Sequence, residues 1–457
     1  MALNSSIFRA YDIRGIYPEE INEATAYQIG RAFAIYLKRN ESEKIDQIIV
    51  GKDARLSSPI LARSFIKGII DNGINVLDIG LVTVDMIYFA SVTMHLPAAM
   101  ITSSHNPKEW NGFKLMKQDA EVIGIDSGLE DIKSIILEVK KESRDIKQGI
   151  TIEKSISGDF LKHVMNFVDP HSLRPMRIAI DASSGSSGPI LKKVLEKLPV
   201  EYIAINFDPD GSFPYHDPDP TKEKNLETLI GKVKTHHYHF GCAFDGDGDR
   251  IIFVDDNGEM VSPSIIGAIM AEHFLKNHPS EKVVYGVVVS RIVPDIINLY
   301  GGIAIREKVG YQNIRKRLKK IGGILGIETS GHYYFKDNFY VDSGIVSLII
   351  MLGILSRQKK SLSALTSKFN KYFSITELHF NVSNPDEFIK KIAQNFEGYD
   401  IDWLDGLTVT TPDFWLNLRP SNTEPLLRLN IEAKDEIILG RVKKDLINLI
   451  KREEASV

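Results

Sequence analysis

Short apolar runs alternate with longer amphipathic stretches along most of the chain, and one order of elements recurs. An apolar run leads through a polar loop into a segment that begins with proline. Proline is well tolerated in the first turn of a helix, because that N–H has no intrahelical partner. Each unit therefore predicts a strand, a loop and a helix. The three units are 48–50 with Pro59, 178–180 with Pro189, and 287–289 with Pro294.

After about residue 370 the pattern changes to a strand, a helix over 386–396, short strands around Arg419 and a charged helix from Leu439. Alternating strands and helices predict α/β layers, and the last pattern predicts an α+β arrangement. A length of 457 residues also suggests several domains. We expect three related α/β domains with mixed sheets and a C-terminal α+β domain around a central cleft. The predicted limits are 1–152, 153–256, 257–370 and 371–457.

The composition is that of an ordinary globular protein, with 43% hydrophobic and 25% charged residues. A net charge of −4 gives no electrostatic indication of nucleic-acid binding. The apolar stretch 343–355 is too short to span a bilayer and predicts a buried helix. Arg9 and Arg14 interrupt the place where a signal peptide would be apolar, and the lone Cys242 cannot form an intrachain disulfide. We therefore expect a cytoplasmic location, with neither nucleic acid nor membrane as a partner.

A serine hydroxyl follows the apolar run 98–101, in the segment Thr-Ser-Ser-His-Asn-Pro at 102–107. Ser104 stands beside His105 and ten residues before Lys114. Ser, Asn and Pro are also usual turn residues, so the segment alone is more typical of a strand-ending turn. Other polar clusters favour a role for the hydroxyl as the carrier of a group.

An acidic turn, Asp-Gly-Asp-Gly-Asp-Arg at 245–250, lies between two apolar runs. Carboxylates at alternating positions in a glycine-hinged loop can converge on one hard cation such as Mg²⁺. An EF-hand requires glycine at the sixth loop position and glutamate at the twelfth, where this chain has Arg250 and Asp256, and it requires flanking helices. The pattern predicts a metal loop between strands, formed by Asp245, Asp247 and Asp249.

Two further loops carry side chains suited to a phosphorylated sugar. Gly-Ile-Glu-Thr-Ser-Gly-His at 326–332 offers a carboxylate, a hydroxyl and an imidazole, which match vicinal sugar hydroxyls. At 419–428, two arginines bracket a turn rich in hydroxyl and amide groups. Guanidinium groups bind phosphate through two parallel hydrogen bonds, so this segment predicts a phosphate site.

In this order, the four motifs resemble the α-D-phosphohexomutase family. The opening Phe-Arg-Ala-Tyr-Asp-Ile-Arg-Gly at 8–15 and Asn422 are similar to its phosphomannomutase/phosphoglucomutase branch. The resemblance implies an isomerase with a phosphoserine, Mg²⁺, a phosphosugar substrate and a hexose 1,6-bisphosphate intermediate. The resemblance is compatible with a monomer or a small homo-oligomer, and it does not determine whether glucose or mannose is the preferred sugar.

Roles are implied residue by residue. Ser104 would carry the phosphate and, with Asp245, Asp247 and Asp249, bind the metal. The catalytic pocket would also contain His105, Lys114, Arg250 and His332. Lys114 is the first candidate for the general base and His332 the second. The substrate would be bound by Tyr11, Arg14, Arg291, Tyr311, Glu328, Ser330, His332, Arg419, Ser421, Asn422, Thr423 and Arg428.

The chain departs from the family pattern at Arg291, where lysine is frequent, and at Tyr311, where many relatives have histidine. Ile327 and Thr329 replace the usual glycine and methionine. Two other classes of function stay open from the sequence. One is a haloacid-dehalogenase-type hydrolase with Asp245 as nucleophile, although that motif expects Thr or Val at position 249. The other is a catalytically silent phosphosugar-binding protein.

Overall fold

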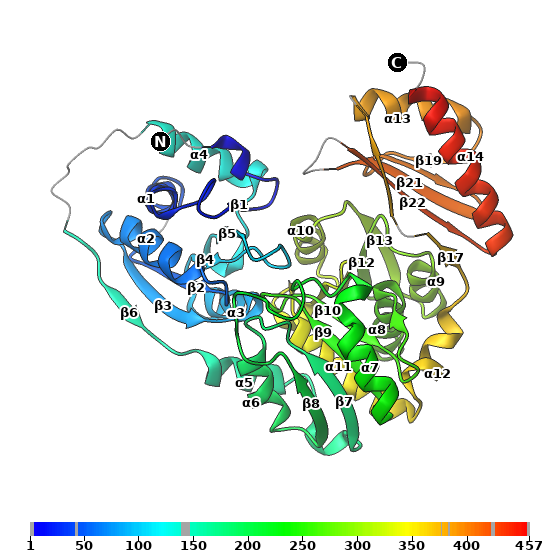
Figure 1. Cartoon of the computed structure of the whole chain (residues 1–457), viewed down its shortest axis with the longest axis horizontal. Helices are drawn as coiled ribbons and strands as arrows, with labels where there is room; N and C mark the ends of the chain where they lie inside the picture. Colours follow the sequence, from blue (N-terminus) through cyan, green and yellow to red (C-terminus); the bar gives the residue numbers. More distant parts are fainter. Residues whose placement is uncertain are drawn as a thin grey trace. The chain divides into compact units, whose positions relative to one another are not determined.

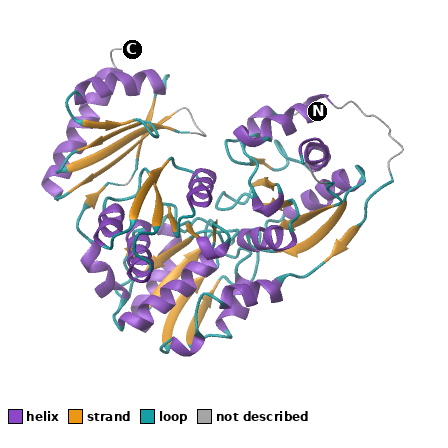
Figure 2. Ribbon diagram, turned by 180° about the vertical axis from the view of Figure 1, so that it is seen from behind, coloured by secondary structure: helices purple, strands orange, loops and turns teal. Residues whose placement is uncertain are grey.

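The computed structural model describes residues 4–41, 44–138, 147–375, 377–382, 384–421 and 426–454. The chain divides into two compact units. The first unit comprises Met1–Val261 and Ser330–Ser363, and the second comprises Ser262–Thr329 and Ala364–Val457. Figure 1 labels the helices and strands, and Figure 2 shows helices packed on the faces of the sheets.

The first sheet of the first unit is mixed. Its order is β1 (Ile13–Ile16), β5 (Trp110–Met116), β4 (Ala98–Ile101), β2 (Gln47–Lys52), β3 (Asn75–Leu81) and β6 (Thr151–Glu153). Strand β5 is antiparallel to both of its neighbours, whereas β2 is parallel to β3 and β4. The associated helices are α1 (Glu23–Asn40), α2 (Ser58–Ile70), α3 (Val84–Met94) and α4 (Leu129–Glu138).

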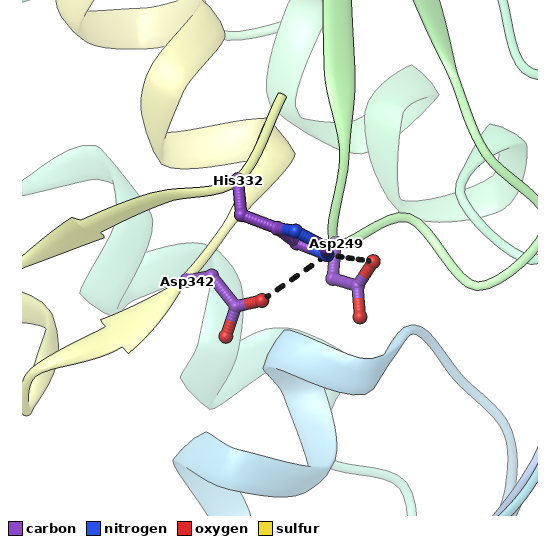
Figure 3. Close-up of side chains that lie close together, drawn as sticks. All are labelled: Asp249, His332 and Asp342. Atoms are coloured by element: carbon purple, nitrogen blue, oxygen red, sulfur yellow. Dashed lines mark hydrogen bonds and ion pairs between the residues drawn. The ribbon is translucent and has the colours of Figure 1, made fainter. Parts of the chain in front are cut away.

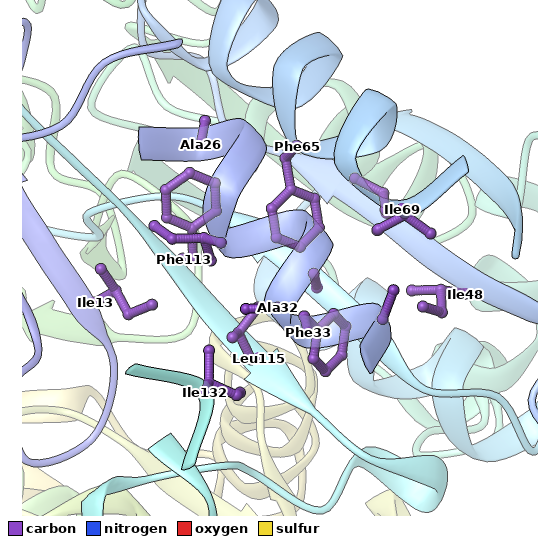
Figure 4. Packing of buried hydrophobic residues seen from close by; sticks show 14 of the residues in the cluster. Ile13, Ala26, Ala32, Phe33, Ile48, Phe65, Ile69, Phe113, Leu115 and Ile132 are labelled. Carbon is purple, nitrogen blue, oxygen red and sulfur yellow. The ribbon is translucent and has the colours of Figure 1, made fainter. Parts of the chain in front are cut away.

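Helices α1 and α2 share the core of this sheet and pack against each other at very short range. Aromatic side chains fill the layer beneath them, with Phe65 stacked between Phe33 and Phe113 (Figure 4). A Cβ added at Gly30 of α1 would lie 2.1 Å from the carbonyl oxygen of Phe65, and one at Gly68 of α2 would lie 2.2 Å from that of Tyr27. Only glycine leaves room for two backbones this close.

The second sheet repeats the pattern of a parallel core with an antiparallel hairpin. Its order is β11 (Met260–Val261), β10 (Ile251–Val254), β9 (Phe240–Phe244), β7 (Met176–Asp181) and β8 (Val200–Ile205). The accompanying helices are α5 (Ser157–Met165), α6 (Gly188–Leu195) and α7 (Glu227–His236). The predicted proline-started helices are confirmed here and in the first sheet, since Pro59 and Pro189 are the second residues of α2 and α6.

The first unit also includes the antiparallel pair β15 (Tyr333–Phe335) and β16 (Val341–Asp342), followed by α11 (Gly344–Gln358). Residues 344–356 of α11 are buried, which confirms the helix predicted from the apolar stretch. Within the described ranges, no helix is both long and apolar enough to cross a membrane.

In the second unit, β12 (Lys282–Gly286) lies parallel to β13 (Ile303–Glu307) and β14 (Leu325–Ile327). The neighbouring helices are α8 (Pro263–Asn277), α9 (Ile292–Leu299) and α10 (Tyr311–Ile321), and α12 spans Leu362–Thr366. The strand predicted at 287–289 is wrong, because these residues form the turn that follows β12. Val287 and Val289 are buried in that turn. Because they are as apolar as the residues of β12, apolarity alone could not show that the strand ends at Gly286.

The C-terminal sheet is antiparallel, which confirms the predicted α+β arrangement. Its order is β17 (Phe373–Ser374), β22 (Leu426–Ala433), β21 (Phe414–Pro420), β20 (Leu407–Thr410) and β19 (Asp400–Asp402), and β18 (Leu378–Asn381) also pairs with β22. Helices α13 (Pro385–Ala393) and α14 (Glu436–Glu454) supply part of its core through Ile389, Ile392, Leu446 and Ile450.

Candidate active site

Ser104 lies in the loop between β4 and β5, in a left-handed backbone conformation with φ 48°. Left-handed φ is uncommon outside glycine and marks a conformation held by its surroundings. The Ser104 amide donates to Thr102 Oγ1 at 2.9 Å, and the Ser104 hydroxyl donates to Asp245 Oδ2 at 2.7 Å. The side chain of Ser104 therefore points at the acidic loop of the second sheet.

Asp245, Asp247 and Asp249 are buried in the turn between β9 and β10, called here the aspartate loop (245–250). The amides of Gly248 and Arg250 donate to Asp245 Oδ1 at 3.0 and 3.1 Å. One oxygen of each carboxylate lies within 4.8 Å of the others. Burial, together with repulsion from Asp249 and Asp247, holds the pKa of Asp245 well above its usual value. Asp247 Oδ1 is buried without a hydrogen-bond partner among the described residues. These oxygens suit a hard divalent cation.

Cationic side chains approach the aspartate loop from the first sheet and from its own end. Lys114 Nζ on β5 donates to Asp247 Oδ2 at 3.0 Å and to Asp249 Oδ2 at 2.8 Å. Arg250 Nε lies 3.9 Å from Asp245 Oδ2. Burial alone would raise the pKa of Asp249, but Lys114 and His332 hold it well below its usual value. The predicted pocket residues Lys114 and Arg250 are thus brought together with the carboxylates.

Both predicted histidines lie in the same cluster. His105 Nδ1 is 3.1 Å from Ser104 Oγ, and burial with the nearby Arg250 and Arg14 holds the pKa of His105 well below its usual value. His332 Nε2 lies 3.1 Å from Asp249 Oδ1 and 3.7 Å from Asp342 Oδ2 (Figure 3). Ser330 Oγ is 2.7 Å from His332 Nδ1. The imidazole of His332 is therefore fixed at both ring nitrogens.

The opening motif lies against the serine loop (residues 102–110). Arg14, on β1, donates through Nη1 to Asn106 Oδ1 at 2.7 Å and through Nε and Nη2 to Asp12. Tyr11 lies in the turn just before β1. The structure thus connects Arg14 to the loop that carries Ser104.

Arg55 is a residue of this site to which the sequence assigned no role, since the segment 51–55 indicates a small basic patch on a loop near the cleft or a plain strand-end turn. Arg55 is fully buried, and its N–H groups are all directed at acceptors. Nη1 donates to the carbonyls of Pro107 and Trp110 at 2.6 and 2.9 Å, and Nη2 donates to those of Ser104 and Asn106 at 2.7 and 2.6 Å. Nε donates to Asp53 Oδ2 at 3.1 Å. One guanidinium group therefore holds the backbone of the serine loop.

In the second unit, Glu328 follows β14 and its Oε1 accepts a hydrogen bond from the Gly310 amide at 3.0 Å. Tyr311 is the first residue of α10. Arg291 donates through Nη1 to the Thr411 carbonyl at 2.8 Å and lies 4.9 Å from the centre of the Tyr372 ring. Ser330 and His332 belong to the other unit, so the predicted sugar loop is divided between the two.

Arg419 on β21 and Arg428 on β22, called here the cationic pair, face each other in the strand register. Glu377 Oε2 lies 3.3 Å from Arg419 Nη2, and Glu377 Oε1 lies 3.0 Å from Arg428 Nη1. Ser421 follows β21, and its amide donates to the Leu426 carbonyl at 2.8 Å. Asn422 and Thr423 lie outside the described residues. Glu377 was also missed by the sequence reasoning, because it lies far from the arginines along the chain.

Matches to family models cover most of the chain. The models describe the phosphoglucomutase/phosphomannomutase α/β/α domains I, II and III and the C-terminal domain, and they match residues 5–143, 158–258, 262–372 and 377–449. The four matches occur in chain order. Together the matches confirm the α-D-phosphohexomutase class predicted from the motifs.

Full-length relatives agree. The chain is 36% identical to the phosphomannomutase of Methanocaldococcus jannaschii over 99% of both chains. It is 34% identical to the phosphomannomutase/phosphoglucomutase of Pseudomonas aeruginosa, over 100% of this chain and 97% of that one. The crystal structure of a phosphoglucomutase/phosphomannomutase family protein from Burkholderia thailandensis superimposes with a TM-score of 0.90 at 30% identity, covering 99% and 98% of the two chains. The protein belongs to the phosphoglucomutase/phosphomannomutase family.

Proposed function

We propose that this protein interconverts hexose 1-phosphates and hexose 6-phosphates of glucose and mannose through a phosphorylated Ser104. The observation that carries the proposal is the hydrogen bond of 2.7 Å from Ser104 Oγ to Asp245, inside the cluster of three aspartates. A phosphate on that oxygen would be directed at the aspartate loop. The sequence similarity to relatives named phosphomannomutase and phosphomannomutase/phosphoglucomutase supports the same activity.

In the proposed transfer, a sugar hydroxyl attacks the phosphorus on Ser104. The bond from phosphorus to the sugar oxygen forms and the bond to Ser104 Oγ breaks. The hydroxyl proton passes to a neutral Lys114 or to His332, and Ser104 Oγ takes up a proton as it leaves. The product is a 1,6-bisphosphate, which returns its other phosphate to Ser104 by the same steps in reverse. Phosphoryl transfer needs mainly positioning and charge stabilisation from the protein. Arg250 lies where it offsets the negative charge of the phosphate and the carboxylates, and Lys114 does the same whenever it is protonated.

Asp245, Asp247 and Asp249 would hold Mg²⁺ together with the phosphate on Ser104. The unpartnered Asp247 Oδ1 and the raised pKa of Asp245, caused by burial and its carboxylate neighbours, both fit an added cation. When bound, Mg²⁺ neutralises charge on the transferring oxygens. His105 lies beside Ser104 Oγ. Arg14 binds Asn106 of the serine loop, and Tyr11 lies in the turn before β1.

In the second unit, Glu328 and Tyr311 would contact the sugar with Ser330 and His332, and Arg291 would lie nearby. Arg419, Ser421 and Arg428, with Asn422 and Thr423, would bind the phosphate that is not reacting. The sequence of these loops assigns no residue to the C2 hydroxyl, at which glucose and mannose differ. A site without a partner for that hydroxyl discriminates weakly, because strong rejection requires a buried polar group left unpaired.

Parallel kinetics on glucose 1-phosphate and mannose 1-phosphate test the proposal, with Mg²⁺ and the matching 1,6-bisphosphate present. We expect kcat/KM values within about tenfold of each other, or about 1.4 kcal/mol. A ratio of the two kcat/KM values of about a thousand or more would show that a residue contacts the C2 hydroxyl directly. Tyr311→His would then be the first variant to examine. No conversion of either sugar would contradict the function.

Phosphopeptide mapping tests the carrier. The purified protein should carry acid-stable phosphate on Ser104, and Ser104→Ala should lack both this phosphate and mutase activity. Ser103→Ala is the matched control, since Ser103 precedes it in the same loop and bonds to Asn106 instead of Asp245. Full activity of Ser104→Ala would favour an aspartyl-phosphate route.

A further inference from the structure

The cationic pair is held by a carboxylate that has no place in the proposed transfer step. Arg419 and Arg428 are directly opposite on β21 and β22, so their side chains lie on the same face of the sheet. His379 on β18 is opposite Arg428 and adds a third basic group to this row. Like charges directly opposite each other destabilise a sheet. An anion is therefore required among them.

Glu377 meets this requirement in the protein itself. It contacts Arg419 at 3.3 Å and Arg428 at 3.0 Å, Asn430 Nδ2 donates to its Oε2 at 3.0 Å, and His379 Nε2 lies 3.1 Å from its Oε1. Burial alone would raise the pKa of Glu377, but Asn430 and the arginines hold it below the usual value, so the carboxylate stays charged at neutral pH.

Glu377 engages only the Nη ends of the two guanidinium groups. Within the described part of the chain, the Nε atoms of Arg419 and Arg428 are buried and have no hydrogen-bond partner. A buried N–H without a partner is costly, and a phosphate oxygen is the acceptor that a guanidinium group prefers. The arginines are thus oriented by Glu377 while their Nε–H groups remain for a ligand.

The proposed reaction places an unusual demand on this pair. Because one serine must exchange phosphate with both ends of the sugar, the non-reacting phosphate is first the one at C1 and then the one at C6, or the reverse. The cationic pair must release one phosphate and take the other within each catalytic cycle. Two uncompensated arginines would bind a phosphate dianion tightly and release it slowly.

We propose that Glu377 is a positioning residue that acts as an internal counterion of the cationic pair and keeps its affinity for phosphate low enough for exchange. This inference rests on the proposed function. In this proposal Glu377 does not bind the phosphate itself but acts through the two arginines that it contacts. The two arginines and the ionised Glu377 together carry one net positive charge, and the two arginines without the carboxylate carry two.

Two effects of removing the charge oppose each other. Losing the carboxylate removes hydrogen bonds that orient the arginines, each of modest net strength and partly replaced by a glutamine oxygen. It also removes repulsion between a carboxylate and a phosphate dianion a few ångströms away, which is the larger effect even when partly screened by solvent. Glu377→Gln should therefore bind phosphosugars more tightly, by about fivefold, a direction that a merely structural role does not predict.

The experiment measures binding of glucose 6-phosphate by calorimetry without Mg²⁺, and then the steady-state kinetics with Mg²⁺. For Glu377→Gln we expect Kd and KM to fall by about fivefold and kcat to fall with them, since release becomes slower. The affinity should also depend more steeply on ionic strength, because the net charge of the pair has doubled. Glu377→Asp keeps the charge and should not bind more tightly.

Asp413→Asn is the matched control. It removes an equal charge from the same sheet at the start of β21, about 20 Å along the strand from Arg419, and it should change Kd by less than about twofold. Unchanged or weaker binding by Glu377→Gln would overturn the proposal, as would loss of cooperative unfolding in both Glu377 variants. If the wild-type protein binds glucose 6-phosphate but shows no mutase activity, the proposed function fails while the comparison of Kd values still tests Glu377.

Discussion

The aspartate loop and the cationic pair each concentrate charge of one sign, but their charges are balanced differently. Asp247 and Asp249 are paired with Lys114, and Asp245 contacts a hydroxyl and two amides. All three carboxylates are almost completely buried. Arg428 keeps 27% of its side chain exposed and shares one carboxylate with Arg419. The aspartate loop is thus shielded from solvent and held by ion pairs and hydrogen bonds, whereas the cationic pair is partly exposed to solvent.

This difference matches two separate tasks. Charge–charge interactions are strongest where water is excluded, and a preorganised buried cluster stabilises charge that develops during transfer. Solvent exposure weakens ion pairs and makes them exchangeable. Substitutions in the aspartate loop should therefore affect kcat, and substitutions in the cationic pair should affect KM. The following predictions test that division.

Asp247→Asn should have the largest effect. It removes one of the three carboxylates and a partner of Lys114, so kcat should fall by about a thousandfold. Removal of divalent ions with EDTA should abolish the activity of the wild-type protein, and added Mg²⁺ should restore it. Glu259→Gln, an exposed site near the same sheet, is the control. Activity that survives complete chelation would show that the aspartates are structural.

Arg55→Met should come next, although Arg55 touches neither the aspartates nor the proposed substrate sites. Without its bonds to four carbonyl groups the serine loop shifts, and a displacement of about 1 Å costs about a hundredfold in rate. KM should change by less than about threefold. Arg63→Met removes an exposed arginine of α2 and should leave kcat unchanged. A rise in KM with normal kcat would assign Arg55 to substrate binding instead.

Arg428→Met should raise KM for glucose 1-phosphate by about tenfold, equivalent to the loss of one charge-assisted interaction. Because the phosphate at this end does not react, kcat should change much less. Initial rates over a wide range of substrate concentration separate the two parameters. A fall in kcat at unchanged KM would contradict the division between the two regions.

Asp85→Asn should have the smallest effect on the rate, because Asp85 contributes to stability and not to the reaction. Asp85 on α3 accepts hydrogen bonds from the hydroxyls of Thr83 and Ser343, and burial raises its pKa from 3.8 to about 7. Between these values the folded protein binds more protons than the unfolded chain, so the free energy of unfolding falls as pH rises. Asp85 changes the free energy of unfolding by at most about 1.4 kcal/mol per pH unit.

Urea unfolding of both proteins at pH 5 to 8 measures this contribution as a difference. The difference in stability, wild type minus variant, should decrease as the pH rises and level off above about pH 7. A difference that stays constant with pH would mean that Asp85 is ionised throughout the range.

The sequence predicted the chemistry-bearing loops because their side chains cluster within a few positions at strand ends. Ser104, Asp245 and Lys114 could be identified in this way, and in the structure Ser104 contacts Asp245 while Lys114 contacts Asp247 of the same loop. Arg55 and Glu377 could not, since neither belongs to one of these motifs and only the fold brings each to partners about fifty residues away along the chain. The prediction of a strand at 287–289 was wrong for a related reason. The residues that pair with β13 and β14 are those of the preceding apolar run, which forms β12.

The contact between Arg55 and the serine loop also bears on how inactive relatives are recognised. A protein that retains the serine motif and all three aspartates would pass a search for the catalytic signature, even with a different residue at position 55. The hydroxyl of its serine would be present but would not point at the aspartate loop. Screening of variants or homologues for activity should therefore include position 55, which lies on a separate strand-end loop and carries no reacting atom.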